Sequence, residues 1–279
     1  MPELPEVETM VRGIRPHCEK RLIEAVIFPP CSRRPISIKP DQDAIRQLAG
    51  QTLHQVGRLG KRVLLKVDSG SVLVVEPRMT GLLLVTDPPT VDHLRVIWKL
   101  GAAADHHQAN QLMFWDRRGL GTLALLTSEQ FEALRQRLGP DALECSTAEW
   151  RQRLSSTGRP IKVALLDQTL AAGIGNLYAS EILHLAHISP LRAANRLSAT
   201  SIAKLHDAVQ HVLSEAIRYE GSTLSDGTYR NALNKDGGYQ NHHRVYDREG
   251  ELCPNCGKSH IRRIVQAQRS TFYCPGCQR

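Results

Sequence analysis

The chain has 279 residues, of which 41% are hydrophobic and 23% charged, as in ordinary globular proteins and unlike disordered ones. Its length suggests about two domains of roughly 150 residues, large enough to fold without disulfide bonds. No apolar run reaches the roughly 18 residues of a membrane helix, and the first ten residues hold three Glu but no Lys or Arg, unlike a secretory leader. We therefore expect a soluble, cytoplasmic protein. The net charge of +8 is compatible with a polyanionic partner without identifying one.

The N-terminal half predicts one helix followed by many short strands. Apolar residues at helical spacing predict a helix over residues 2–16, and Pro5 suits its first turn. The strand-like runs are residues 22–28, 62–67, 71–76, 82–86, 94–100, 111–115 and 122–126. Asp68-Ser69-Gly70 reads as a hairpin turn between two of them. Short strands at this spacing predict a sandwich or barrel-like domain.

The C-terminal half is predicted to be mainly helical. Its expected helices cover residues 129–138, 161–168, 176–186 and 201–219. Gly221 stands where a C-terminal cap belongs, and residues 221–245, rich in Gly, Ser, Asn and Asp, predict a long loop.

Four of the seven cysteines crowd the end of the chain. Two Cys-x-x-Cys pairs, separated by 17 residues, have the spacing of a tetrahedral zinc site, which we favour over redox pairs or free thiols. The four ligands would be Cys253, Cys256, Cys274 and Cys277. Four sulfur ligands leave no position for a catalytic water, so the predicted zinc, one ion per chain, is structural. Arginines around this hairpin favour contact with nucleic acid over a merely solvated basic surface.

The N-terminus offers a possible nucleophile. Met1 precedes a small residue and its removal is expected, which would leave Pro2 as a terminal imino group beside Glu3. An α-amino group has a pKa near 7.8 against about 10.4 for lysine, so far more of it is neutral near pH 7.5. A neutral secondary amine can form an iminium with a sugar C1′, and an adjacent carboxylate can move protons. Taken alone, this pattern is also that of an unremarkable helix start.

Three motifs together resemble the formamidopyrimidine-DNA glycosylase family (Fpg or MutM) of the Fpg/Nei superfamily. They are Pro2-Glu-Leu-Pro-Glu-Val-Glu-Thr9, Ala172-Gly-Ile-Gly-Asn176-Leu-Tyr-Ala-Ser-Glu181, and Ile261-Arg-Arg-Ile-Val-Gln266 with Arg269-Ser-Thr-Phe-Tyr-Cys274. The resemblance spans the whole chain in the same order. It implies an α+β multidomain protein with an N-terminal catalytic β-sandwich flanked by helices over 1–128. A hinge and helix–two-turns–helix DNA-binding domain with a lesion-capping loop would cover 129–246, and a zinc finger 247–279.

The resemblance implies a bifunctional DNA glycosylase and abasic-site lyase that acts on double-stranded DNA as a monomer. Pro2 would attack C1′ of a flipped nucleotide and expel 8-oxoguanine or a formamidopyrimidine, with β- and δ-elimination following. Glu3 would donate a proton to the reaction. Lys61 and Arg269 would be the proton donors for β- and δ-elimination.

The resemblance also implies a set of DNA contacts. Glu6 would hold the damaged nucleotide, and Met79, Arg118 and Leu120 would fill the space that it leaves. Further contacts, mostly to phosphates, are implied for His93, Lys162, Asn176 and Tyr239, and for Arg269.

Three positions depart from the family pattern. Leu120 replaces a usual Phe, Gly119 replaces a common basic residue, and Glu76 stands where a His commonly opens the motif before Met79. These changes put the lesion search and the opposite-base preference in doubt, but not the chemistry.

Two other functions stay open at this point. One is an endonuclease VIII-type glycosylase for oxidised pyrimidines, although the N-terminal motif and the loop 221–229 favour oxidised purines. The other is a non-catalytic zinc-hairpin DNA-binding protein, which would need neither Pro2 nor Glu3.

Overall fold

The computed structural model describes residues 2–102, 108–225 and 227–279, so the expected removal of Met1 lies outside its range. Contacts divide the chain into two compact units. The first unit contains the chain up to Gln136 together with Tyr219–Gln240. The second contains Arg137–Arg218 and Asn241–Arg279. Among the described residues, none of the helices combines the length and apolar character needed to cross a membrane.

The first unit is built on a nine-stranded sheet with the order β2-β9-β5-β4-β3-β1-β7-β8-β6. Its strands are β1 (Arg21–Ile27), β2 (Ser37–Lys39), β3 (Thr52–Leu59), β4 (Arg62–Val67), β5 (Val72–Glu76), β6 (Gly81–Leu84), β7 (Leu94–Leu100), β8 (Gln111–Asp116) and β9 (Thr122–Leu126). β1 joins the two halves, because it pairs with β3 on one side and with β7 on the other. Buried side chains of both halves, such as Leu65 and Phe114, share one apolar cluster. The halves therefore act as the two layers of a β-sandwich.

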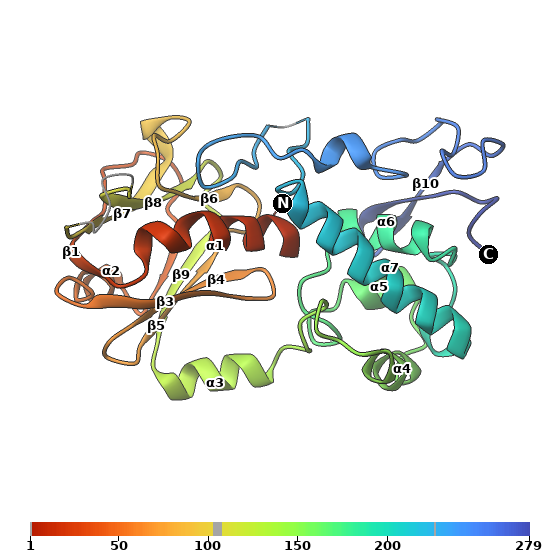
Figure 1. Cartoon of the computed structure of the whole chain (residues 1–279), viewed down its shortest axis with the longest axis horizontal. Helices are drawn as coiled ribbons and strands as arrows, with labels where there is room; N and C mark the ends of the chain where they lie inside the picture. Colours follow the sequence, from red (N-terminus) through yellow and green to blue (C-terminus); the bar gives the residue numbers. More distant parts are fainter. Residues whose placement is uncertain (1, 103–107, 226) are drawn as a thin grey trace. The chain divides into compact units, whose positions relative to one another are not determined.

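Helix α1 (Leu4–Cys18) packs against β3, β4 and β6 of this sheet (Figure 1). Its residues Val7, Val11 and Ile14, spaced three and four positions apart, lie in the main apolar cluster. Met10 belongs to a second cluster with Trp115 of β8 and Tyr229 of the segment 219–240. Because α1 begins at residue 4, this packing fixes the position of the N-terminal residues. The first unit also contains α2 (Gln42–Arg46), a 3₁₀ turn η1 (Val91–His93) and α3 (Ser128–Gln136).

The second unit combines helices with a β-hairpin. Its elements are α4 (Thr147–Ser155), α5 (Ile161–Leu165), α6 (Asn176–Leu185), η2 (Ala194–Arg196), α7 (Ala199–Arg218), β10 (Arg262–Gln266) and β11 (Arg269–Tyr273); η3 (Tyr239–His242) spans the boundary between the units. In α6 every residue from Leu177 to His184 is buried. It packs against α5, α7 and β11 (Figure 1). An apolar helix buried all round is the centre of its unit.

Most predicted elements are found within two residues of their predicted ends, and three strands match to the residue: β4, β7 and β9. The Asp68–Gly70 turn does join two antiparallel strands, β4 and β5. The helix predicted over 161–168 is shorter and ends at Leu165, because Asp167 already turns the chain by binding the Thr169 N–H through its side chain.

Besides the short β2 and the 3₁₀ turns η1, η2 and η3, three elements were not predicted. Strand β3 has a register shift between Leu53 and Gln55, so its buried residues Leu53 and Val56 lie three positions apart. The sequence therefore lacks the alternation of apolar and polar residues that predicts a strand. Helix α4 begins with a capping box in which the Ser146 N–H donates to Glu149 Oε2 (2.8 Å). Helix α2 is only one turn long and follows Asp41, whose side chain accepts the Ala44 N–H.

The segment 219–240 was predicted as part of the helical domain 129–246, but its contacts group it with the first unit. The reason is local: Ser222, Tyr229 and Ala232 contact α1 or lie in its apolar clusters. The zinc-finger segment groups with the helices of the second unit.

Candidate functional site

The N-terminal end of α1 is buried. Pro2 and Glu3 are both buried, and Glu3 is the N-cap residue, so it precedes the first helical turn. The Glu3 N–H donates to Glu6 Oε2 over 2.9 Å. Glu6 Oε1 in turn accepts the backbone N–H of Ser222 over 2.9 Å. The carboxylate of Glu6 therefore connects the residue beside Pro2 to the segment 219–240.

The segment 219–240 fits closely against this end of α1. Gly221 has φ +80°, and a Cβ there would come within 2.9 Å of Glu6 Cγ, so no larger residue fits. The Tyr229 hydroxyl donates to the carbonyl of Glu220 (3.0 Å). Burial, reinforced by nearby Glu6, raises the pKa of Tyr229 well above its usual value, which keeps this donor protonated. Tyr239 was predicted to contact DNA, but in this structure its side chain is fully buried in the protein. Its backbone N–H donates to the Gly221 carbonyl.

Lys61 lies in the two-residue turn between β3 and β4. Its neighbour Gly60 has φ +57°, which this kind of turn requires. Arg58 holds the turn, because its Nη1 donates to the Gly60 carbonyl (3.0 Å) and its Nε to Glu8 Oε2 on α1 (2.9 Å). Burial alone would raise the pKa of Glu8, but the hydrogen bonds from Arg58 and Arg12 outweigh it and lower that pKa. The turn is thus tied to α1 by an ion pair.

The predicted void-filling residues lie on two turns that share one buried carboxylate. Met79 is in the turn between β5 and β6, and Arg118 and Leu120 are in the turn between β8 and β9. Asp116, with no exposed surface, accepts the Thr80 hydroxyl at Oδ1 and the Gly121 N–H at Oδ2 (2.8 Å). The Arg118 N–H donates to Thr80 Oγ1 (3.0 Å) and to Asp116 Oδ1 (3.2 Å). The structure therefore brings the two turns together.

Two of the departures from the family pattern have a structural account. Gly119 has φ +62°, and a Cβ there would overlap the Arg34 carbonyl oxygen, so this turn admits only glycine. Glu76 forms ion pairs with Arg62 and Arg78, each at 3.3 Å. Arg78, which has φ +57°, is the residue before Met79. Nothing in the structure explains Leu120 in place of the usual Phe.

His93 lies at the end of η1 with its ring edge-on to Trp115, at 5.4 Å between centroids. Burial, aided by the positive charge of Arg33 and Arg95, lowers the pKa of His93. The ring is therefore neutral at pH 7, with one nitrogen able to donate and the other to accept a hydrogen bond.

Lys162 and Asn176 meet at the start of α6. Lys162 is fully buried, and its Nζ donates to Asn176 Oδ1 and to the Ser270 carbonyl (3.3 Å). Asn176 Nδ2 donates to the same carbonyl over 3.0 Å. Ser270 directly follows Arg269, the first residue of β11. The start of α6, a helix N-terminus and therefore a position that favours anions, is joined to the hairpin that carries Arg269.

The four cysteines at the end of the chain form one cluster. Their sulfur atoms all lie within 4.8 Å of one another. The Sγ atoms of Cys253 and Cys277 are 3.7 Å apart, and those of Cys256 and Cys274 are 3.8 Å apart. A tetrahedral ion with metal–sulfur bonds of about 2.3 Å requires sulfur atoms roughly 3.8 Å apart. The cluster therefore fits one structural zinc ion.

Three contributors were missed from the sequence. Asp116 acts by its buried carboxylate, which joins the turns that carry Met79 and Arg118. Ser222 acts by its backbone N–H, which donates to Glu6. Glu181 is also fully buried and accepts the backbone N–H groups of Arg244, Val245 and Tyr246 at 2.8–2.9 Å. A carboxylate at the end of an apolar run, as at Asp116, or within one, as at Glu181, is the signal that could have found two of them.

Comparison with known proteins gives matches along nearly the whole chain. The formamidopyrimidine-DNA glycosylase N-terminal domain matches residues 1–123, its H2TH domain 138–228, and the zinc finger found in FPG and IleRS 250–279. The formamidopyrimidine-DNA glycosylase of Chloroflexus aggregans is 42% identical and aligns over 100% of this chain and 98% of its own length. The crystal structure of the Thermus thermophilus MutM (Fpg) protein is 36% identical, with a TM-score of 0.84 over 99% of this chain and 98% of that one. A Lactococcus lactis FPG mutant, in complex with Fapy-dG-containing DNA, is 33% identical, with a TM-score of 0.86 over 100% of both chains.

Proposed function

Because the chain belongs to the formamidopyrimidine-DNA glycosylase family, we propose that it is a base-excision-repair enzyme that removes oxidised purines from double-stranded DNA. Its substrates would be 8-oxoguanine and formamidopyrimidines, and it would also cleave abasic sites. The observation that carries the proposal is the buried Pro2–Glu3 terminus, connected through Glu6 to the segment 219–240. A DNA-binding protein without catalysis would need neither Pro2 nor Glu3.

The proposed first step needs the mature terminus. After Met1 is removed, the neutral Pro2 nitrogen attacks C1′ of the flipped nucleotide and forms an N–C1′ bond. The bond from C1′ to the purine N9 breaks, and the base leaves with the electron pair and takes up a proton. The Pro2 nitrogen then loses its proton, the C1′–O4′ bond breaks, and O4′ takes up a proton. This opens the sugar ring and leaves an iminium between Pro2 and C1′. Glu3, adjacent to Pro2, is the residue we assign to proton donation in this step.

Two eliminations complete the proposed reaction. Loss of a C2′ proton from the iminium expels the 3′ phosphate (β-elimination), and a second proton loss expels the 5′ phosphate (δ-elimination). We assign the proton donors of these steps to Lys61 and Arg269. Water then hydrolyses the iminium, freeing Pro2 and the sugar fragment and leaving a one-nucleotide gap with phosphate ends.

Flipping a nucleotide costs a few kcal/mol of stacking, and the space it leaves must be filled. We propose that Met79, Arg118 and Leu120 fill it. The shared carboxylate of Asp116 supports this assignment, because it fixes the two turns that carry these residues relative to each other. Glu6 is proposed to hold the damaged nucleotide.

The DNA backbone is proposed to contact His93, Lys162, Asn176 and Arg269. The hydrogen bonds that join Lys162 and Asn176 to the Ser270 carbonyl support their acting as one group with Arg269. The contacts proposed for Lys162 and Tyr239 would need a rearrangement, since both side chains are fully buried. Zinc would be held by the four cysteines and would supply no chemistry beyond fixing the hairpin.

We also propose that the enzyme acts as a monomer. Its proposed location is the cytoplasm, where bacterial DNA is found. Size-exclusion chromatography with light scattering checks the first of these statements. A dimer that forms at the protein concentrations where the enzyme is active, with activity rising as the dimer forms, would contradict the monomer proposal.

The test of the proposed function is a borohydride trap on duplex DNA containing one 8-oxoguanine opposite cytosine. Wild-type protein should give a covalent adduct, and Pro2→Gly should lose it while still binding DNA. An adduct with thymine glycol DNA alone would indicate an endonuclease VIII-type glycosylase. No adduct with either duplex, despite confirmed loss of Met1 and tight binding, would indicate a non-catalytic DNA-binding protein.

A further inference from the structure

Three of the four cysteine sulfurs face N–H donors from their own zinc-finger segment. Cys256 receives the backbone N–H groups of Lys258 and Ser259, and Cys274 those of Gly276 and Cys277. The Asn255 side-chain Nδ2 donates to Cys277 Sγ over 3.3 Å. Thiolates bound to zinc keep negative charge, which such donors stabilise, and they also fix the ligands in place.

The fourth sulfur, that of Cys253, has a partner from outside the finger. His184, near the C-terminal end of α6, places Nε2 3.3 Å from Cys253 Sγ. The ring is 2% exposed, and its other nitrogen, Nδ1, is buried with no hydrogen-bond partner among the described residues. A proton on Nδ1 would leave a buried donor unpaired, so the favoured tautomer carries it on Nε2 and donates to sulfur.

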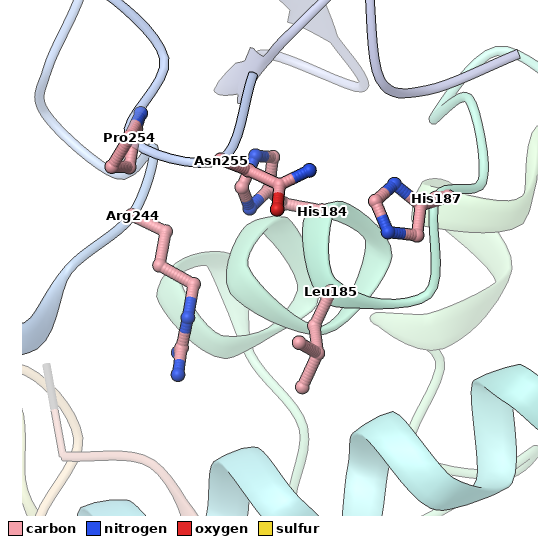
Figure 2. A pocket seen from close by; sticks show the side chains of 6 residues that line it. All are labelled: His184, Leu185, His187, Arg244, Pro254 and Asn255. Carbon is pink, nitrogen blue, oxygen red and sulfur yellow. The ribbon is translucent and has the colours of Figure 1, made fainter. Parts of the chain in front are cut away.

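The ring belongs to the wall of a cavity of about 200 Å³, which is also lined by Leu185, His187, Arg244, Pro254 and Asn255. Figure 2 shows the His184 ring between α6 and the segment that carries Pro254 and Asn255. His187, in the same wall, is exposed and follows the end of α6. His184 therefore spans the distance between helix and finger, whereas His187 offers a matched comparison in the same cavity.

We propose that His184 is a positioning residue of the zinc centre, which donates a hydrogen bond to the Cys253 thiolate and attaches the centre to α6. The opposite end of α6 is joined to β11, since Asn176 Nδ2 donates to the Ser270 carbonyl. Between these ends, Glu181 accepts three backbone N–H groups from residues 244–246. The metal thus fixes the helix that begins at Asn176 as well as the hairpin. This role goes beyond the proposed glycosylase activity and does not depend on it.

The test uses zinc-loaded, full-length protein and three variants at His184 and His187, with Cys253→Ser as the reference for a lost zinc ligand. His184→Phe keeps a ring but has no N–H, His184→Gln keeps an N–H donor, and His187→Asn changes the same cavity at a residue with positive φ, which Asn tolerates. Transfer of zinc to a chromogenic chelator should be roughly 10–100-fold faster from His184→Phe, as for other lost outer-shell partners. His184→Gln should lie closer to wild type, and His187→Asn should match it.

A second readout separates the hydrogen bond from simple packing. In cobalt-substituted protein, loss of a donor raises the energy of the thiolate electrons, so the thiolate-to-cobalt charge-transfer band should move to lower energy in His184→Phe. Wild-type band position and release rate in His184→Phe would overturn the proposal. If that variant does not fold, His184→Gln decides: release as fast as from the Cys253→Ser protein would equally overturn it. Borohydride trapping of the same samples reports separately on the proposed glycosylase.

Discussion

The Thr80 hydroxyl donates a hydrogen bond to Asp116, and this contact joins the two turns that carry Met79 and Arg118. Thr80 comes from the β5–β6 turn, and Asp116 ends β8. The same carboxylate accepts the N–H groups of Arg118 and Gly121 in the second turn. Because Asp116 is fully buried, water cannot replace a hydrogen bond that one of these partners loses. Each partner is therefore held in place by the carboxylate.

Asp116→Asn should destabilise both turns. The amide nitrogen must replace one oxygen and will face an N–H or hydroxyl donor, which leaves a buried donor unpaired. We expect about 1–3 kcal/mol less stability in urea unfolding and slower excision of 8-oxoguanine. Asp68→Asn is the control, because Asp68 accepts one exposed N–H, from Thr52. Equal losses in the two variants would show that the carboxylate does not hold the turns.

Glu6→Ala should release the segment 219–240 from α1. The variant loses the acceptors of the Glu3 and Ser222 N–H groups. Hydrogen bonds to charged groups contribute about 1.5–3 kcal/mol, so local opening should increase at least tenfold. Amide hydrogen exchange of residues 220–225 measures it, with Glu132→Ala on the exposed face of α3 as the control. Unchanged exchange in Glu6→Ala would mean that other contacts hold the segment.

Arg269→Gln should weaken DNA binding uniformly across sequences. If Arg269 contacts one phosphate, the slope of log K against log salt should fall by about 0.9. Fluorescence anisotropy with an abasic-site duplex at several salt concentrations measures this slope. Arg135→Gln, an exposed substitution on α3, changes the net charge by the same amount and should leave the slope as it is. A slope that falls equally in both variants would indicate a general charge effect.

The folded state should lose stability between pH 6.5 and pH 4 through His243. Burial lowers the pKa of His243 to about 4, against about 6.5 in the unfolded chain. In this window the unfolded chain binds more protons, so the free energy of unfolding decreases as the pH falls. The full effect, reached below pH 4, is about 3 kcal/mol. His243→Gln should show a correspondingly flatter profile in urea unfolding.

Comparison with wild type in the same buffers removes the contribution of the zinc site, because both proteins contain the same site. His211→Gln, at an exposed position of α7, should keep the wild-type profile. A His243→Gln profile parallel to that of wild type would contradict the assignment.

Elements with one strong local pattern were predictable, and those that depend on other segments were not. α1 combines helical apolar spacing with a proline in its first turn, and β4 is a short apolar run that ends at a clear turn. The capping box of Ser146 and Glu149 was present in the sequence and would have predicted α4. In contrast, β3 is recognisable only with its partner β4, because the shift at Leu53 breaks the alternation within the strand.

The candidate site shows the same division. The four cysteines could be grouped from spacing alone, since two Cys-x-x-Cys pairs suffice to define a tetrahedral site. The hydrogen bond from Ser222 to Glu6 joins residues 216 positions apart through a backbone N–H. Because every residue except proline has this group, the residue type at position 222 could not have predicted the contact. The role of His184 likewise depends on the packing of α6 against the finger.

The tight turn at Gly119 has an evolutionary consequence. Its left-handed backbone and the Arg34 carbonyl, which occupies the space of any Cβ, mean that no side chain can be introduced here by a single substitution. The basic residue common in the family would be tolerated only after the segment around Arg34 had moved. Every residue type has this carbonyl, so it is the backbone path around position 34, and not the identity of its side chain, that must change together with position 119. A replacement that is harmless in a relative with a different backbone path would be damaging in this chain.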